Sequence, residues 1–273
     1  MSRKLSFIPP IPDYEWVRNQ MKEDLKYRLE TRKEETSLGR PLYYRINVQI
    51  VMTQECPNNC PFCVEKINPM KGCFKADVQK ESLKKILKEH PNARLTITGG
   101  EPSLYPKHVK DLVDIYKENS SQTFVTINTS GYDSSINGLA HINLSVNDYV
   151  KPDPQQFPDS TIQTVLKDEQ INLDFIKNYM STYPNHSYSF RYFSCLDKQD
   201  YDISIFNELQ NDPEITVRTF RIGDFFVYVT FDYKNIHARI TLGDMYQQTN
   251  NDYQDGYSNI IIHPDGRIAV NWN

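Results

Sequence analysis

The sequence reads E-C-P-N-N-C-P-F-C-V from residue 55 to residue 64, shortly after an apolar, strand-like stretch at Tyr43–Thr53. Cys56, Cys60 and Cys63 therefore stand on one short loop with the spacing C-x3-C-x2-C. Each iron of a [4Fe–4S] cluster normally takes one cysteine, so three thiolates suit such a cluster and leave one iron open. An open coordination position separates a catalytic metal site from a structural one. The loop therefore predicts a cluster that takes part in a reaction.

Zinc and disulfide bonds are the structural alternatives for clustered cysteines. A structural zinc site needs four ligands, and the nearest histidines, His90 and His108, fall in helix-like stretches away from the cysteine loop. A disulfide framework is disfavoured because the chain has five cysteines, an odd number, and no secretory features. An iron–sulfur cluster is the favoured interpretation.

A second motif, G-G-E-P, occupies residues 99–102 at the end of the apolar run 93–98. The two motifs, in this order and each after an expected strand, resemble the signature of the radical S-adenosylmethionine (SAM) enzymes. Phe62 fills the aromatic position of that family's C-x3-C-x-aromatic-C pattern. The resemblance extends from Tyr43 to about Cys195 and fades beyond it.

Strand-like and helix-like segments alternate from residue 43 onward, which predicts right-handed β-α-β units and a parallel sheet. The resemblance implies an α/β fold, a partial (β/α)6 radical SAM barrel. Both motifs follow strands, and parallel barrels carry their active sites at the carboxyl-terminal ends of the strands. Strands are expected at 43–53, 94–98, 123–128, 142–146, 161–166 and 188–193, and helices at 78–88, 107–118 and 173–183.

The core is expected to lie between two further segments. Residues 1–42 are expected to form an N-terminal helical appendage, followed by the barrel core at 43–211. Residues 212–273 are expected to form a C-terminal extension of antiparallel β-hairpins, with a turn at Pro264-Asp265-Gly266. This extension has no cysteine, so we expect a single cluster. Its expected strands are 225–232, 236–242, 259–263 and 267–270.

The resemblance also implies a mechanism. Cys56, Cys60 and Cys63 would hold three irons, and the fourth would bind SAM. Reduction would then break a carbon–sulfur bond of SAM, and the resulting 5′-deoxyadenosyl radical would abstract hydrogen from a substrate. The glycines of G-G-E-P would admit SAM closely because they lack a Cβ, and Glu101 would pair with its ammonium group. The residues expected to contact SAM are Gly99, Gly100, Glu101, Asn128, Ser130, Ser145, Asn147 and Arg191.

Three residues carry separate expectations. Arg191 is a cation within an apolar strand, and because an unpaired buried charge is costly we expect a carboxylate partner from SAM, a substrate or the chain itself. Cys195 should stand at the rim of the barrel, where a cysteine can donate a hydrogen atom as a catalytic residue; inert packing is the alternative. Cys73 is expected to be a small buried side chain.

The whole chain restricts location and partners. A formal net charge of -4 and an isoelectric point near 5.9 argue against nucleic acid as a main partner. The N-terminal sequence lacks the apolar core of a signal peptide, and no stretch approaches a membrane span. We therefore expect an oxygen-sensitive protein of the cytoplasm, without a membrane partner, where thiols stay reduced.

The substrate is the least determined feature. A radical SAM enzyme acting on a small molecule or nucleotide is the first interpretation, with an electron donor such as flavodoxin or ferredoxin. A peptide- or protein-modifying enzyme, of epimerase, cross-linking or activating type, is the second. A non-enzymatic metal-binding regulatory protein is the third.

Overall fold

The computed structural model describes residues 5–37, 46–63, 72–193, 198–223, 225–244 and 259–269. The chain divides into two compact units. Unit 1 comprises residues 1–43 and 163–253, and unit 2 comprises residues 44–162 and 254–273. Each unit therefore combines segments that are far apart in the sequence.

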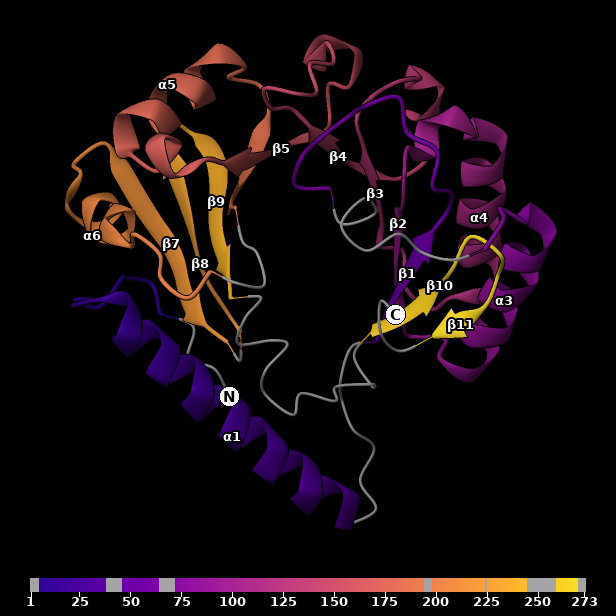
Figure 1. Ribbon diagram of the computed structural model, residues 1–273, viewed down its shortest axis with the longest axis horizontal. Coiled ribbons are helices and arrows are strands. Elements are labelled where there is room, and N and C mark those ends of the chain that lie inside the picture. The colour runs from indigo at the N-terminus through magenta and orange to yellow at the C-terminus, as the bar shows by residue number, and fades with distance from the viewer. Residues whose placement is uncertain are drawn as a thin grey trace. The chain divides into compact units, whose positions relative to one another are not determined.

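A mostly parallel sheet forms the centre of unit 2, with the order β11-β10-β1-β2-β3-β4 (Figure 1). Strands β10, β1, β2, β3 and β4 are parallel to their neighbours, and β11 is antiparallel to β10. The strands are β1 (Asn47–Val51), β2 (Arg94–Thr98), β3 (Val125–Thr129), β4 (His141–Ser145), β10 (Asn259–Ile262) and β11 (Ile268–Ala269).

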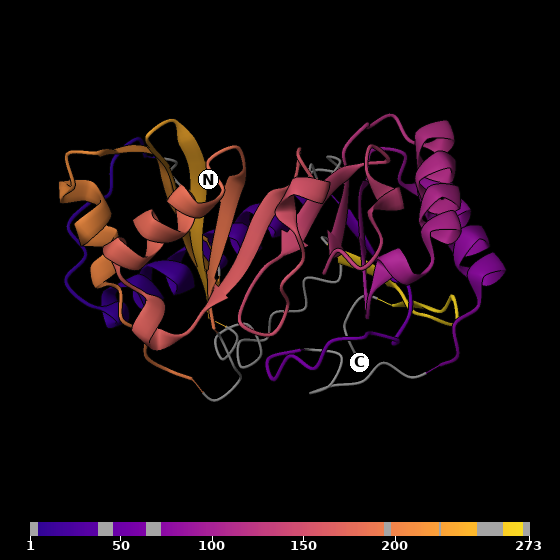
Figure 2. The same ribbon diagram turned by 90° about the horizontal axis from the view of Figure 1, so that it is seen from above.

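Two amphipathic helices lie side by side along the unit 2 sheet, as both Figure 1 and Figure 2 show. These are α3 (Ala76–Glu89) and α4 (Pro106–Asn119). Their apolar residues recur at helical spacing and are buried, whereas their charged residues face solvent. Pro106 starts α4 at a position where the missing N–H costs nothing. Short 3₁₀ helices lie at η1 (Pro102–Leu104), η2 (Ser134–Ile136) and η3 (Pro154–Gln156).

Unit 1 contains a mixed sheet with the order β6-β9-β8-β7. Strands β6 and β9 are parallel, and β9, β8 and β7 are antiparallel to one another. Strand β5 (Thr161–Leu166) spans the boundary between the two units. The other elements of unit 1 are α1 (Tyr14–Ser37), η4 (Asp168–Gln170), α5 (Leu173–Thr182), β6 (Ser187–Tyr192), α6 (Ser204–Asn211), β7 (Ile215–Ile222), β8 (Phe226–Tyr233) and β9 (Ile236–Gly243).

The alternation of strands and helices expected from the sequence is confirmed, and β2 and β5 have the expected bounds. Helix α6 and strand β7 were missed, because both are short or interrupted in their apolar pattern. The C-terminal extension is also not purely antiparallel: β10 and β11 form the expected hairpin, but β10 pairs in parallel with β1. Among the described helices, none combines the length and apolar character needed to cross a membrane.

Candidate active site

The cysteine loop follows the carboxyl end of β1 in unit 2. Cys56, Cys60 and Cys63 are half-buried and free of disulfide bonds. The backbone N–H of Cys63 donates to the carbonyl of Cys60 at 3.3 Å. Asn58, between the first two cysteines, donates through Nδ2 to Oγ of Ser130 at 2.8 Å and lies 3.8 Å from Sγ of Cys56. The loop is thus tied to the turn after β3.

The G-G-E-P motif holds the start of this loop. The N–H of Gly100 donates to the carbonyl of Thr53 at 2.6 Å, and that of Glu101 donates to the carbonyl of Glu55 at 2.7 Å. A Cβ added to Gly100 would lie 2.1 Å from the Glu55 oxygen. Gly99 has a φ of +124° and backbone atoms of Met52 and Thr53 at 2.8 Å from the position of a Cβ. The glycines therefore admit the cysteine loop, and their contact with SAM stays a prediction.

The carboxylate of Glu101 joins the motif to the turn after β3. Glu101 is only 1% exposed. Its Oε1 accepts hydrogen bonds from the N–H of Ser103 at 2.9 Å, from Oγ of Ser103 at 2.7 Å and from Oγ1 of Thr129. Its Oε2 accepts from the N–H of Ser130 at 2.7 Å and from Oγ of Ser130. These donors all belong to the chain itself, and the predicted pairing of Glu101 with the SAM ammonium stays a prediction.

The remaining expected SAM residues of unit 2 lie at the ends of neighbouring parallel strands or just after them. Oδ1 of Asn128 accepts from Nδ2 of Asn143 at 2.9 Å. Oδ1 of Asn147 accepts from the N–H groups of Tyr149 and Val150 at 2.9 and 3.1 Å, which closes its own turn. Ser145 ends β4 and is half-buried. Because β1, β2, β3 and β4 are adjacent and parallel, their carboxyl ends bring these residues and the cysteine loop to one edge of the sheet.

A buried polar network behind the loop was not foreseen from the sequence. Gln79 of α3 is fully buried and donates through Nε2 to the carbonyls of Val51 at 2.9 Å and His263 at 2.9 Å. Its Oε1 lies 2.9 Å from Nε2 of His108, which must donate this bond. Burial, reinforced by the charge of Lys80, lowers the pKa of His108 to about 4. The neutral imidazole therefore helps Gln79 hold the end of β1. The available signal was a glutamine on the apolar face of a helix.

Arg191 lies on β6 in unit 1. With its amide oxygen turned toward the guanidinium, Gln163 accepts from Nε and Nη2 of Arg191 at 2.7 and 2.8 Å. Arg191 is exposed by surface area, but desolvation by the surrounding chain and the positive charge of Arg239 lower its pKa to about 10. The partner of Arg191 within the chain is thus a neutral amide. The predicted pairing of Arg191 with a carboxylate of SAM or of a substrate stays a prediction.

The expectations for the two other cysteines, Cys195 and Cys73, fare differently. Cys195 lies outside the described residues, so its expected place at the rim stays a prediction. Cys73 is exposed, and the expectation that it is buried was wrong. Its neighbour Gly72 lies in a bend and has a φ of +118°, a backbone conformation that favours glycine.

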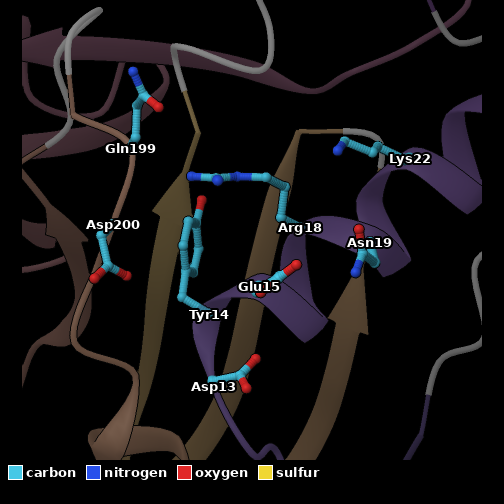
Figure 3. A pocket seen from close by; sticks show the side chains of 8 residues that line it. All are labelled: Asp13, Tyr14, Glu15, Arg18, Asn19, Lys22, Gln199 and Asp200. Carbon is cyan, nitrogen blue, oxygen red and sulfur yellow. The ribbon is translucent and has the colours of Figure 1, made fainter.

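A separate hollow of about 540 Å³ lies in unit 1, beside the first turns of α1 (Figure 3). Arg18 lies over the ring of Tyr14 at 5.1 Å, and Tyr14 donates through its hydroxyl to the buried carboxylate of Asp244 at 2.6 Å. Burial and Asp244 raise the pKa of Tyr14. These contacts fasten α1 to the end of β9. The hollow is lined by Asp13, Tyr14, Glu15, Arg18, Asn19, Lys22, Gln199 and Asp200, none of which was a predicted site residue.

The donor set of the cysteine loop fits an iron–sulfur cluster better than any other group. It consists of three cysteine thiols on one loop, none of them in a disulfide, and thiolates are the ligands of iron–sulfur clusters. Within the described residues, no three His, Cys, Asp or Glu side chains are already gathered closely enough to hold a metal ion.

The profile of the radical SAM superfamily matches residues 50–179. The matched segment contains the three cysteines of the loop and the G-G-E-P motif. This segment of the chain is therefore similar to the radical SAM superfamily. The match implies a [4Fe–4S] cluster and SAM as cofactors, as the sequence predicted.

Solved structures share the fold. Streptococcus suis SuiB bound to the precursor peptide SuiA has a TM-score of 0.56 and 17% identity, covering 89% of this chain and 63% of that chain. SuiB bound to S-adenosylmethionine has a TM-score of 0.56 and 16% identity, covering 92% of this chain and 72% of that chain. This likeness confirms the expected fold class, a mixed α/β partial barrel of the radical SAM type with C-terminal antiparallel strands.

Another solved structure is less similar to the chain. The tagged protein anSMEcpe with bound AdoMet has a TM-score of 0.47 and 15% identity, covering 60% of this chain and 59% of that chain. The chain thus spans 59% of anSMEcpe and 63% of peptide-bound SuiB. No curated protein sequence matches the chain.

Proposed function

We propose that the chain is a radical SAM enzyme that uses one [4Fe–4S] cluster. The observation that carries this proposal is the loop of three cysteines outside any disulfide, held by the backbone of G-G-E-P within the segment that matches the family. When bound, the cluster and SAM together supply reductive cleavage of a carbon–sulfur bond of SAM and abstraction of a hydrogen atom from the substrate. The chain's own residues hold, orient and shield these groups.

Each site residue has a role in this proposal. Cys56, Cys60 and Cys63 hold three irons. Asn58 and the Glu101 carboxylate position the cysteine loop against the turn after β3. Arg191 binds a carboxylate of SAM or of the substrate, and Cys195 donates a hydrogen atom. The proposed contacts with SAM are Gly99, Gly100, Glu101, Asn128, Ser130, Ser145 and Asn147.

The proposal extends to the organisation and partners of the chain. The barrel core at 43–211 carries the reaction, with the segments 1–42 and 212–273 beside it. An electron donor such as flavodoxin or ferredoxin reduces the cluster. The cytoplasm is the proposed compartment because it keeps the thiols reduced.

A small molecule or nucleotide is the first candidate substrate. A peptide is the second candidate. It is supported by the fold likeness to peptide-bound SuiB, which extends over 89% of this chain, beyond the segment that matches the family. Identity of 17% makes this a likeness of fold, so the peptide is a candidate and not an assignment.

The test is formation of 5′-deoxyadenosine by anaerobically reconstituted, chemically reduced protein. Wild type should release it from SAM, and Cys60→Ala should release at most about a hundredth as much, because loss of one iron ligand prevents assembly of the cluster. Cys73→Ala is the matched control: this cysteine is free and exposed but lies outside the loop, so the variant should behave as wild type.

Two outcomes would contradict the proposal. Equal release by wild type and Cys60→Ala would mean that the loop does not hold the reacting cluster. A full complement of iron with saturable SAM binding but without 5′-deoxyadenosine, in the presence and absence of cell extract as substrate source, would favour the non-enzymatic alternative.

A further inference from the structure

The sheet of unit 1 has two unlike faces. On one face, apolar side chains of the strands are buried beneath α5 and α6. The ring of Tyr192 stacks with that of Phe206 at 6.3 Å, and the rings of Tyr188 and Phe190 each meet that of Tyr179 at about 6 Å. Because successive side chains of a strand alternate between faces, the residues between these point to the opposite face. That opposite face is polar.

Two rows of cross-strand neighbours cover the polar face. Strand register places Arg191 of β6 beside Thr241 of β9, Thr241 beside Tyr228 of β8, and Tyr228 beside Arg221 of β7. The adjoining row is formed in the same way by Ser189, Arg239, Thr230 and Thr219. We call Arg191, Arg221 and Arg239 the arginine group. Neither row includes a carboxylate.

The arginine group lacks a counter-ion among the described residues. Arg191 bonds to the neutral amide of Gln163, and Nη2 of Arg239 lies 3.4 Å from Oγ of Ser189. Nε of Arg221 is buried without a hydrogen-bond partner in the described part of the chain, and its guanidinium lies 5.5 Å from the ring centre of Phe226. Oγ1 of Thr241, between Arg191 and Tyr228, is likewise buried without a partner there.

The next row along the same face shows the contrasting, satisfied arrangement. Asp232 accepts from Nε of Arg218 at 2.7 Å and lies 2.9 Å from Nδ1 of His237. In that row each charge has a partner within the sheet. In the arginine group, burial lowers the pKa of Arg239, and burial together with Arg239 lowers the pKa of Arg191. Cations placed side by side without a counter-ion repel one another, and an incoming anion would remove that repulsion.

We infer that the arginine group, with the hydroxyls of Thr241 and Tyr228, binds an anionic oxygen group of the substrate, a phosphate or a carboxylate. This inference rests on the proposed function, whose substrate it narrows to a negatively charged molecule. Guanidinium groups bind phosphate and carboxylate through paired N–H donors, and the unpartnered hydroxyl of Thr241 supplies a further donor.

The charge of the group points to the substrate rather than to SAM. SAM carries a sulfonium and an ammonium group against one carboxylate, so its net charge near neutral pH is positive. Two arginines beyond Arg191 would repel such a molecule. They attract a doubly negative group, such as a phosphate or a pair of carboxylates.

The experiment is calorimetric titration of the reconstituted full chain with two probes, inorganic phosphate and glutarate. Wild type should bind at least one of them saturably. Arg239→Gln and Arg221→Gln should each weaken binding about tenfold, which corresponds to about 1.4 kcal/mol. Thr241→Val should weaken probe binding less than the arginine variants do, because it keeps the charge of the site. Arg218→Gln is the matched control and should bind the probes as wild type does, because Arg218 already pairs with Asp232. Preference for phosphate indicates a phosphorylated substrate, and preference for glutarate a carboxylated one.

Three results would overturn the inference. The first is that wild type binds neither probe saturably. The second is that Arg218→Gln loses as much probe affinity as the variants of the arginine group. The third is that Arg239→Gln and Arg221→Gln lose SAM affinity in parallel, which would assign the group to the cosubstrate. Circular dichroism spectra of the variants, compared with that of wild type, show whether a loss of binding is due to misfolding. The titration needs no turnover, so absence of 5′-deoxyadenosine formation would contradict the proposed function and leave this inference standing.

Discussion

At the scale of single residues, the Glu101 carboxylate shows how one buried charge organises the site. It accepts hydrogen bonds from two backbone N–H groups and three hydroxyls of Ser103, Thr129 and Ser130. Such bonds to an ionised group are stronger than neutral ones, and they offset the cost of burying the charge. Glu101 therefore links the end of β2 to the turn after β3, where Ser130 also receives the bond from Asn58 of the cysteine loop.

His108 is the residue whose titration should be visible in the stability of the chain. Its pKa is lowered to about 4 in the folded state from an ordinary value of 6.5, so between these values the unfolded chain binds the proton and the folded chain does not. Folding stability should therefore fall as the pH falls from about 7 toward 4, by about 2 to 3 kcal/mol from this group at pH 4.5.

Urea unfolding at pH 7 and pH 4.5 measures this effect. His108→Gln keeps a donor for Gln79 but cannot titrate, so its stability should change about 2 kcal/mol less between the two pH values than that of wild type. His141→Gln, at an exposed histidine, is the control and should follow wild type. Equal pH dependence in His108→Gln and wild type would show that His108 is not the group responsible.

At the scale of elements, the site depends on four parallel strands whose carboxyl ends carry short functional turns. The β1 loop carries the cysteines, the β2 turn carries G-G-E-P, and the ends of β3 and β4 with the turns after them carry the other expected SAM contacts of unit 2. The loop after β1 approaches the β2 turn so closely that only glycine fits there.

Gly100→Ala should disrupt this approach. Its Cβ would lie 2.1 Å from the Glu55 oxygen, a backbone atom that can move only with the loop. We expect the bonds of Gly100 and Glu101 to the loop to break and the iron content after reconstitution to fall at least about threefold. Gly243→Ala is the control, because nothing lies within 4 Å of its Cβ position. Iron per chain and visible absorbance measure the result; wild-type iron content in Gly100→Ala would show that the approach is not required.

At the scale of the whole molecule, each unit is completed by a segment from an end of the chain. The N-terminal helix α1 belongs to unit 1, together with residues 163–253. Its Val17 and Met21 are fully buried. In unit 2, β10 adds a parallel strand beside β1, the strand that leads into the cysteine loop.

Met21→Ala should therefore destabilise the protein as a core substitution does, by about 2 to 5 kcal/mol. Leu29→Ala, on the same helix, removes a side chain that is 40% exposed and should cost less than about 0.5 kcal/mol. Urea unfolding of the two variants measures the difference. Equal stabilities would mean that α1 is a peripheral appendage and contributes little to the core of unit 1.

Much of the core was predictable because its signals are local. The spacing of Cys56, Cys60 and Cys63 specifies the chemistry of the loop within a few residues, and G-G-E-P marks the end of β2. Apolar periodicity located α3 and α4 within two residues of their bounds. The parallel pairing of β10 with β1 was not predictable in this way, because it joins strands about 200 residues apart and no local pattern encodes the partner.

The sequence by itself determined the family, the cysteine loop and the alternation of strands and helices, because motif spacing and side-chain periodicity are properties of short stretches. Only the tertiary structure decided which residues touch: that Gly100 admits the cysteine loop, that Gln79 and His108 support β1, and that three arginines share one face of a sheet. Those contacts depend on strand register and long-range packing, which arise only when distant segments pair.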